Sequence, residues 1–226
     1  MPKLPNFKYE KAVLKRLPDA IVVGVDEAGC APLAGPVVAG AVILDQKKLP
    51  KALRQGLDDS KKIPFDRREE LYGILISCGA AVIGVGRAEV HEIESFNILN
   101  AAHLAMRRAV ASLSHAPTFA LIDGNRKPKD FPCALETIVK GDGKSLSIAA
   151  ASIVAKVTRD RYMIELARAY PGYGWESNAG YPTPDHRKAI IALGLTPHHR
   201  KTFGTVKKQL AGDAPTQVEM FEAALG

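Results

Sequence analysis

The chain reads IVVGVDEAGCAPLAGPVVAGAVIL over residues 21–44, and this stretch decides the fold. Residues 21–25 are apolar and mostly β-branched, which predicts a buried strand. Asp26 and Glu27 follow directly, and a turn rich in glycine, alanine and proline leads to a second apolar strand over residues 36–44. We therefore expect the two strands to form a hairpin, with the acidic pair directly after the first strand.

Strands and helices are interleaved in the rest of the chain. The patterns predict strands over residues 80–85, 118–122 and 135–139, and helices over 66–78, about 95–113, 145–169 and 185–193. Ser95 is the expected N-cap of the second helix. Residues 45–63 are expected to form a loop or short helix, residues 171–184 no regular element, and residues 198–208 a basic segment. The expectation is one α/β domain over residues 1–226, with a mixed five-stranded sheet flanked by helices and a helical C-terminal extension over about residues 171–226.

The composition favours an intracellular polyanion-binding protein. Lys and Arg number 31 against 24 Asp and Glu, a net charge of +7, so nucleic acid is the first candidate partner and a basic but indifferent enzyme is the alternative. Cys30, Cys78 and Cys133 lie far apart, which argues against a disulfide framework and a thiolate zinc site. No apolar run has the length of a signal peptide or membrane span, so a cytoplasmic protein without a membrane partner is expected.

Acidic residues stand at the ends of three predicted strands. Asp26 and Glu27 follow the first, Asp123 follows the strand over 118–122, and Asp142 follows the strand over 135–139. Carboxylates that converge there need cations to offset their repulsion, and oxygen-only ligands favour Mg²⁺ or Mn²⁺. Two such ions form the clamp used in phosphodiester hydrolysis. The alternative is a set of solvated loop carboxylates, because Asp-Gly is a common turn pair.

Several motifs resemble the ribonuclease HII family, in order, from about residue 20 to residue 205. They are VGVDEAGCAPLAGPVVAGAVIL (23–44), DSKK (59–62), NILNAA (97–102), IDGN (122–125), KGDGKSLSIAAASIVAKVTRD (140–160), YPGYGW (170–175), GYPTPDH (180–186) and HRKTF (199–203). The resemblance implies an RNase H-like fold and two Mg²⁺ or Mn²⁺ ions held by the catalytic residues Asp26, Glu27, Asp123 and Asp142. It further implies hydrolysis of the RNA strand of RNA–DNA hybrids, and incision at ribonucleotides embedded in duplex DNA, leaving 3′-hydroxyl and 5′-phosphate ends. Type 3 relatives carry a sizeable N-terminal domain, so type 2 fits better.

The resemblance also implies a set of nucleic-acid contacts. The positions that match are Gly29, Cys30, Ala31, Lys61, Lys62, Asn97, Lys140, Ser145, Ser152, Lys156 and Tyr181. The lysines are expected to neutralise phosphates. Tyr181 matches a tyrosine that packs on a sugar at the RNA-to-DNA junction, and the alternative is an anchor of its glycine-rich loop. Trp175 and Tyr173 are expected to be core or loop anchors.

This chain departs from the family at the turn after Asp-Glu-Ala, where the family has Gly-Arg-Gly. Here Gly29, Cys30 and Ala31 stand instead. A cysteine lacks the arginine's fork of donors, and the β-carbon of Ala31 narrows the approach to the ribose. We expect weaker recognition of a single embedded ribonucleotide with retained chemistry, unless another lysine or arginine supplies the lost charge. Cys30 is a poor candidate nucleophile, because no histidine partner lies in a matching motif.

Two competing functions and one further partner stay open. The first competitor is another metal nuclease on the same fold, such as a junction resolvase, and the second is a binding-only protein. The peptide Gln217-Val218-Glu219-Met220-Phe221 loosely resembles a sliding-clamp motif, whereas the alternative is an amphipathic terminal helix. A monomer is expected. Use in ribonucleotide excision repair, in primer removal during DNA replication, or in both is left open.

Overall fold

The computed structural model describes residues 4–210, and these form two compact units. The first unit comprises residues 4–30 and 36–161, and the second comprises residues 31–35 and 162–210. The second unit takes in the described part of the expected C-terminal extension, together with residues 31–35 and 162–170.

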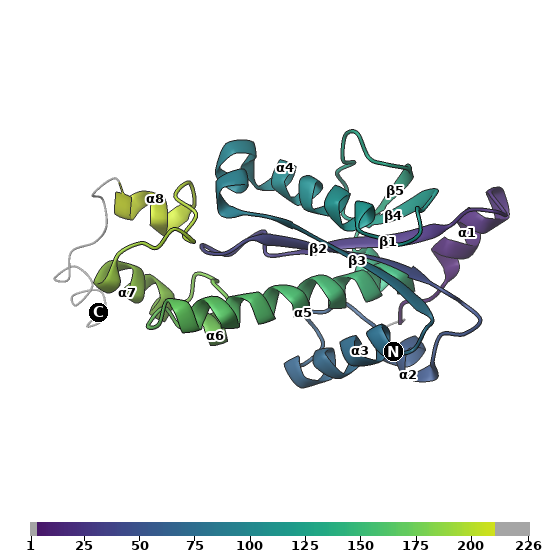
Figure 1. Cartoon of the computed structure of the whole chain (residues 1–226), viewed down its shortest axis with the longest axis horizontal. Helices are drawn as coiled ribbons and strands as arrows, with labels where there is room; N and C mark the ends of the chain where they lie inside the picture. The colour runs from purple at the N-terminus through teal and green to yellow at the C-terminus, as the bar shows by residue number, and fades with distance from the viewer. Residues whose placement is uncertain (1–3, 211–226) are drawn as a thin grey trace. The chain divides into compact units, whose positions relative to one another are not determined.

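A mixed five-stranded sheet forms the centre of the first unit (Figure 1). Its strands are β1 (Val22–Ala28), β2 (Val37–Leu44), β3 (Ala81–Ala88), β4 (Phe119–Asp123) and β5 (Ala134–Ile138), in the order β3-β2-β1-β4-β5. The β1–β2 and β2–β3 pairs are antiparallel, and the β1–β4 and β4–β5 pairs are parallel. The predicted sheet and hairpin are confirmed. One boundary was wrong: Asp26 and Glu27 lie within β1, because they pair with Gly40 and Ala39 of β2.

Helices cover both faces of this sheet (Figure 1). They are α2 (Lys51–Gly56), α3 (Phe65–Ser77), α4 (Val90–Ala111) and α5 (Leu146–Ala169). The start of α5 packs with α2 and α3 on one face, where Val42, Leu53 and Val154 belong to one buried core, and α4 covers the other face. Two glycines permit the close approach. A β-carbon on Gly24 would lie 2.1 Å from the Ser147 backbone of α5, and one on Gly86 would lie 2.1 Å from the Ala105 carbonyl oxygen of α4.

Helix α4 begins earlier than its sequence pattern predicts. The predicted N-cap, Ser95, lies inside the helix and donates its hydroxyl to the His91 carbonyl. The helix begins at a capping box in which Glu89 and Glu92 each accept from the other's backbone amide. A kink at Asn97, with φ 65° and ψ 167°, divides the helix. The predicted start was therefore wrong, and it fell close to the kink.

The N-terminal segment secures the start of α5, a role that the sequence did not predict. Helix α1 (Lys8–Arg16) carries Glu10, which is 2% exposed. The Glu10 Oε1 accepts from the Ser145 hydroxyl at 2.7 Å and from the Ser147 amide at 3.0 Å, while its Oε2 is buried without a partner among the described residues. The Asn6 amide donates to the Lys144 carbonyl. The bond from Ser147 satisfies a first-turn amide of α5, and the other two hold the residues directly before this helix, which follows the loop that carries Asp142.

The second unit contains α6 (Trp175–Asn178), α7 (Pro184–Leu193) and α8 (Gly204–Leu210). Trp175 is fully buried, and it shares a core with Tyr173 and Met163, so the prediction that Trp175 and Tyr173 anchor this region is confirmed. The single turn α6 interrupts the segment expected to lack regular structure. Within residues 4–210, no helix is both long and apolar enough to cross a membrane.

Candidate metal centre and nucleic-acid site

Three of the four predicted carboxylates meet at one edge of the sheet. Asp26 lies in β1, Asp123 ends β4, and Asp142 lies in the short 3-10 helix η1 (Gly141–Gly143) that follows β5. One carboxylate oxygen from each lies within 4.8 Å of the other two. The parallel pairing of β1 with β4 and of β4 with β5 brings these positions to the same edge. Asp26 and Asp142 are both buried.

Short backbone hydrogen bonds orient this cluster. The Gly141 amide donates to Asp123 Oδ1 at 2.6 Å, which ties η1 to the end of β4. The Gly143 amide donates to Asp142 Oδ1 at 2.8 Å, and the Glu27 amide donates to Asp26 Oδ1 at 2.7 Å. Each aspartate therefore keeps one oxygen fixed by the backbone.

Burial and mutual repulsion make the cluster costly without a cation. Burial, then the charges of Glu27 and Asp123, raises the pKa of Asp26 well above its usual value. Burial and Asp123 likewise raise the pKa of Asp142 and of Glu27. The hydrogen bond from the Gly143 amide partly opposes the shift of Asp142, that from the Cys30 thiol partly opposes the shift of Glu27, and the nearby Lys61 charge opposes both. A divalent cation would reverse these shifts, and the all-oxygen donor set fits a hard ion.

Glu27 lies beside the cluster but outside the group of three. It lines a cavity with Cys30 and Asp123, and the Cys30 thiol donates to Glu27 Oε1 at 3.6 Å. The Cys30 thiol, at the position where the sequence resemblance implies an arginine, is thus directed toward a carboxylate in this structure. Gly29 has φ 98°, and a β-carbon there would meet the side chain of the buried Arg159, so the turn requires glycine at this position.

The predicted nucleic-acid residues fall into two groups by exposure. Lys61, Lys62, Asn97, Lys140 and Ala31 are exposed. Asn97 is the most telling of these, because a non-glycine residue at φ 65° and ψ 167° is strained, and such strain concentrates at functional sites. Lys140 has a left-handed backbone at φ 55° just before Asp142.

The other group makes its hydrogen bonds and ion pairs inside the protein, and direct contact of these residues with the nucleic-acid backbone stays a prediction. Ser145 is fully buried and donates to Glu10, and Ser152 is 4% exposed and donates to the Ser60 hydroxyl at 2.8 Å. Lys156 is half-buried and pairs with Asp160 at 2.7 Å. Ser145 directly precedes α5, and Ser152 and Lys156 lie in its first half. Their place indicates that they support the loops around the site.

Ser152 in particular supports the loop that carries Lys61 and Lys62. Its partner Ser60 lies in this loop, and Arg68 of α3 donates to the Ser60 carbonyl at 3.1 Å. Lys62 pairs with Asp58 at 3.1 Å within the same loop.

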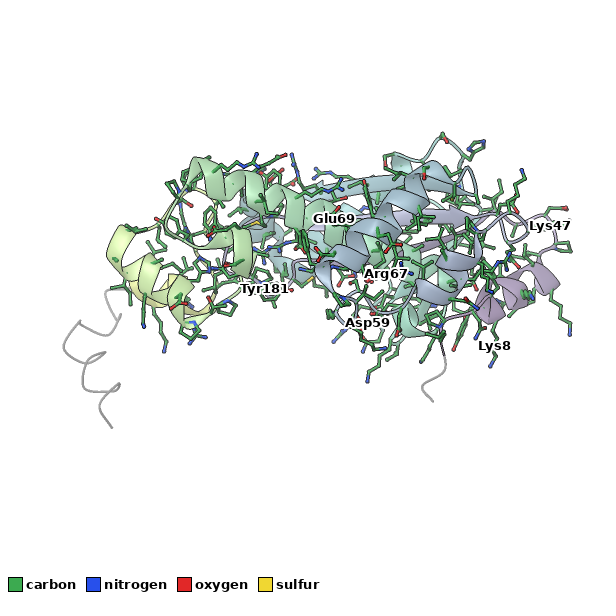
Figure 2. The ribbon with its side chains drawn as sticks, turned by 90° about the horizontal axis from the view of Figure 1, so that it is seen from below. Lys8, Lys47, Asp59, Arg67, Glu69 and Tyr181 are labelled. Carbon is green, nitrogen blue, oxygen red and sulfur yellow. The ribbon has the colours of Figure 1, made fainter. Side chains whose placement is uncertain are left out.

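Tyr181 belongs to the second unit, in the loop between α6 and α7 (Figure 2). Its side chain is half-buried. Its amide donates to the Asn178 carbonyl at 2.9 Å, and its own carbonyl lies 2.9 Å from His186 Nδ1. The backbone on both sides of this tyrosine is therefore held in place.

Comparisons with known proteins assign the class and then the family. The crystal structure of a ribonuclease H2 from Pyrococcus horikoshii matches 83% of this chain and 95% of its own, with TM-score 0.68 and 30% identity. A solved Bst-RNase HIII in complex with Mn²⁺ covers 85% of this chain and 70% of its own, with TM-score 0.68 but 20% identity. The mixed sheet and its acidic centre thus define a metal nuclease of the RNase H-like class.

The sequence matches sharpen this class to a family. The ribonuclease HII model matches residues 23–206. A ribonuclease HII of Ruegeria pomeroyi is 55% identical over 206 residues, which covers 91% of this chain and 85% of that protein. The chain belongs to the ribonuclease HII family, and it is a metal-dependent endoribonuclease of ribonuclease H type 2.

Sequence reasoning missed a group of basic residues beside the acidic centre. Arg126 lines the same cavity as Glu27 and Asp123. The tetrapeptide Arg126-Lys127-Pro128-Lys129 directly follows the IDGN motif, and this local density of charge is the signal that would have found it.

Proposed function

We propose that this enzyme hydrolyses the RNA strand of RNA–DNA hybrids, and also incises duplex DNA at embedded ribonucleotides, by two-metal-ion catalysis. The observation that supports this most directly is the meeting of Asp26, Asp123 and Asp142 within 4.8 Å at one edge of the sheet. Glu27 completes the proposed ligand set, because its charge acts on Asp26. We propose Mg²⁺ or Mn²⁺ as the ions, on the strength of the oxygen-only ligands.

The proposed chemistry divides between the ions and the chain. Bound ions would activate the attacking water and stabilise the leaving oxygen, which gives 3′-hydroxyl and 5′-phosphate ends. The chain's own part is to hold the ligands through backbone amides, and to place Lys61 and Lys140 beside the phosphates. Asn97 and Tyr181 are proposed to contact the sugar–phosphate backbone, with Tyr181 at the RNA-to-DNA junction.

The altered turn leads us to propose a preference for continuous hybrids over single ribonucleotides. The Cys30 thiol offers one weak donor, and it is already directed toward Glu27. Ala31 adds a β-carbon where the family has glycine. Neither change touches the three clustered aspartates, so the chemistry should be retained.

The test uses three labelled duplexes with Mg²⁺ or Mn²⁺: a continuous hybrid, a DNA duplex with one ribonucleotide, and an all-DNA duplex. We expect cutting of both ribonucleotide-containing duplexes, faster for the hybrid, and none of the all-DNA control. Equal cutting of all-DNA would favour another nuclease such as a junction resolvase. If Asp26→Asn tightened binding and the wild type never turned over, the binding-only alternative would replace this proposal.

A sliding-clamp partner, the cellular location and the oligomeric state of the enzyme are further predictions. The sliding-clamp peptide over residues 217–221 lies outside the described residues, so a clamp contact stays a prediction. Loss of clamp pull-down on deleting residues 216–226 would support it. A cytoplasmic monomer stays our expectation, and its use in ribonucleotide repair or primer removal is left to experiment.

A further inference from the structure

Two adjoining cavities extend the acidic centre toward a basic surface. The first, about 260 Å³, is lined by Glu27, Cys30, Asp123 and Arg126 and by side chains of α4. The second, about 480 Å³, is lined by Phe96, Leu99, Asn100, His103, Leu104, Arg107, Arg126, Lys127 and Lys129. Leu99, His103 and Arg126 line both. The two cavities therefore form one groove that begins at the carboxylates and continues between α4 and the loop after β4.

The charged side chains of the second cavity are all cationic. Arg107, Arg126, Lys127 and Lys129 line it, and its lining contains no acidic residue. Because uncompensated cations gathered along a groove repel one another, this arrangement favours an anionic occupant. The exposed Phe96 and Leu99 beside the charges offer apolar surface to a sugar or base.

Internal contacts hold the loop in place but leave its cations available. The Arg107 Nη1 donates to the Lys129 carbonyl at 3.2 Å, so α4 fixes the backbone of this loop. Arg126 is exposed, and within residues 4–210 it has neither a hydrogen bond nor an ion pair. Its guanidinium is thus free to accept an anion as a partner.

We propose that Arg107, Arg126, Lys127 and Lys129 form a basic branch of the active-site groove that binds the sugar–phosphate backbone, and that Arg126 supplies part of the phosphate contact that Cys30 cannot make. This inference rests on the proposed function, and it adds a specific residue to it. Arg126 is the suited member, because it shares the cavity of Cys30 and carries the planar fork of donors that matches a phosphate.

The decisive experiment is a double-mutant cycle on the full-length enzyme. Arg126→Ala, Cys30→Arg and the double variant are assayed on the hybrid and on the single-ribonucleotide duplex over a range of salt concentrations. Arg126→Ala should lower kcat/KM on the single-ribonucleotide duplex by about tenfold or more, and on the hybrid by less, because one charge-assisted phosphate contact is lost. The slope of log affinity against log salt should fall by about one. Cys30→Arg should restore the single-ribonucleotide activity of Arg126→Ala.

Matched controls separate this contact from general charge. Lys47→Ala also removes one surface cation, from the loop after β2 (Figure 2), and it should leave both rates and the salt slope unchanged. Arg126→Lys keeps the charge but not the fork, and it should be intermediate. Thermal unfolding of each variant checks that the fold is intact.

The outcomes distinguish the two proposals. If the wild type cuts both substrates while Arg126→Ala matches it in rate and salt slope, the basic branch is wrong and the proposed function stands. If Arg126→Ala is impaired but Cys30→Arg fails to restore it, the branch stands and the replacement of the family arginine by Arg126 is overturned. If no variant shows ribonucleotide-dependent cutting, the proposed function itself fails.

Discussion

Two buried polar clusters, one in each unit, differ in whether the protein itself supplies all of their hydrogen-bond and charge partners. In the first unit, three aspartates share one edge of the sheet, and burial together with repulsion raises the pKa of Asp26 and Asp142. In the second unit, His186 and His199 are both fully buried, and burial lowers the pKa of each, that of His199 to about 4. Both clusters thus hold groups whose charged forms are disfavoured.

The histidine pair has a complete set of partners. The Trp175 indole donates to His186 Nε2 at 2.9 Å, so the proton of His186 stands on Nδ1 and is donated to the Tyr181 carbonyl. The Thr196 amide donates to His199 Nδ1 at 3.0 Å, so the proton of His199 stands on Nε2, 3.3 Å from His186 Nε2. Both rings are therefore assigned as neutral, and the single lone pair of His186 Nε2 is shared between the Trp175 indole and the longer contact from His199.

The difference separates a structural cluster from a functional one. The histidines find their hydrogen-bond partners within their own chain, so replacing one should mainly lower the stability of the fold. The aspartates need a bound cation to offset their mutual repulsion. Replacing one of them should therefore mainly lower the activity, and can even relieve repulsion in the metal-free protein.

The largest expected effect comes from Asp26→Asn. Activity on the RNA–DNA hybrid should fall by about 10³-fold or more, the scale that follows loss of a charge-stabilising group in an active site. The free energy of unfolding of the metal-free variant should equal or exceed that of the wild type, because one repelling charge is gone. Steady-state cleavage and chemical denaturation test the pair of expectations. A variant that is both active and destabilised would contradict the functional assignment of this cluster.

His186→Ala should show the opposite pattern. We expect the free energy of unfolding to fall by about 2–3 kcal/mol, because Trp175 loses its buried acceptor and the Tyr181 carbonyl loses its donor. Hybrid cleavage per folded molecule should stay within a few-fold of the wild type. His115→Ala, at an exposed histidine, is the matched control and should change stability by no more than about 0.5 kcal/mol. Unaltered stability in His186→Ala would show that this hydrogen-bond network contributes little to the free energy of unfolding.

How far the sequence could predict these features depends on the kind of signal involved. The β1–β2 hairpin and the acidic positions could be predicted, because apolar strands and Asp-Gly turns are local sequence patterns. The role of Glu10 was not visible, since its partners Ser145 and Ser147 lie more than a hundred positions away. Helix α5 is rich in alanine and has no clear apolar face, so the burial of Ser152 could not be predicted from its pattern.

Glu10 is a further buried acid that sharpens the comparison, with a smaller expected effect. Its Oε1 caps α5 through Ser145 and Ser147, so Glu10→Ala should lower the free energy of unfolding by about 1–2 kcal/mol. Glu10→Gln retains an acceptor and should lose less. Denaturant unfolding of both variants measures this, with hybrid cleavage as the second readout. A loss of activity without a loss of stability would place Glu10 with the functional acids instead.

The smallest expected effect is on the pH dependence of the free energy of unfolding, to which the two clusters contribute with opposite signs. Because folding raises the pKa of Asp26, its protonated form favours the metal-free folded state below the ordinary value of 3.8, and this contribution is lost as pH rises through the folded pKa. The depressed pKa of His199 acts in reverse: its contribution to stability is present above pH 6.5 and is lost as pH falls through about 4.

Asp26→Asn and the wild type share the histidines, so the difference between their free energies of unfolding isolates the acidic cluster. We expect Asp26→Asn to be the more stable without metal at pH 7.5, and the gap to close toward pH 4. Mg²⁺ at pH 7.5 should also close the gap, since a bound cation stabilises the intact cluster more than the variant. If neither acid nor Mg²⁺ changed this difference in stability, repulsion among the aspartates would not be the property that distinguishes the acidic cluster from the histidine pair.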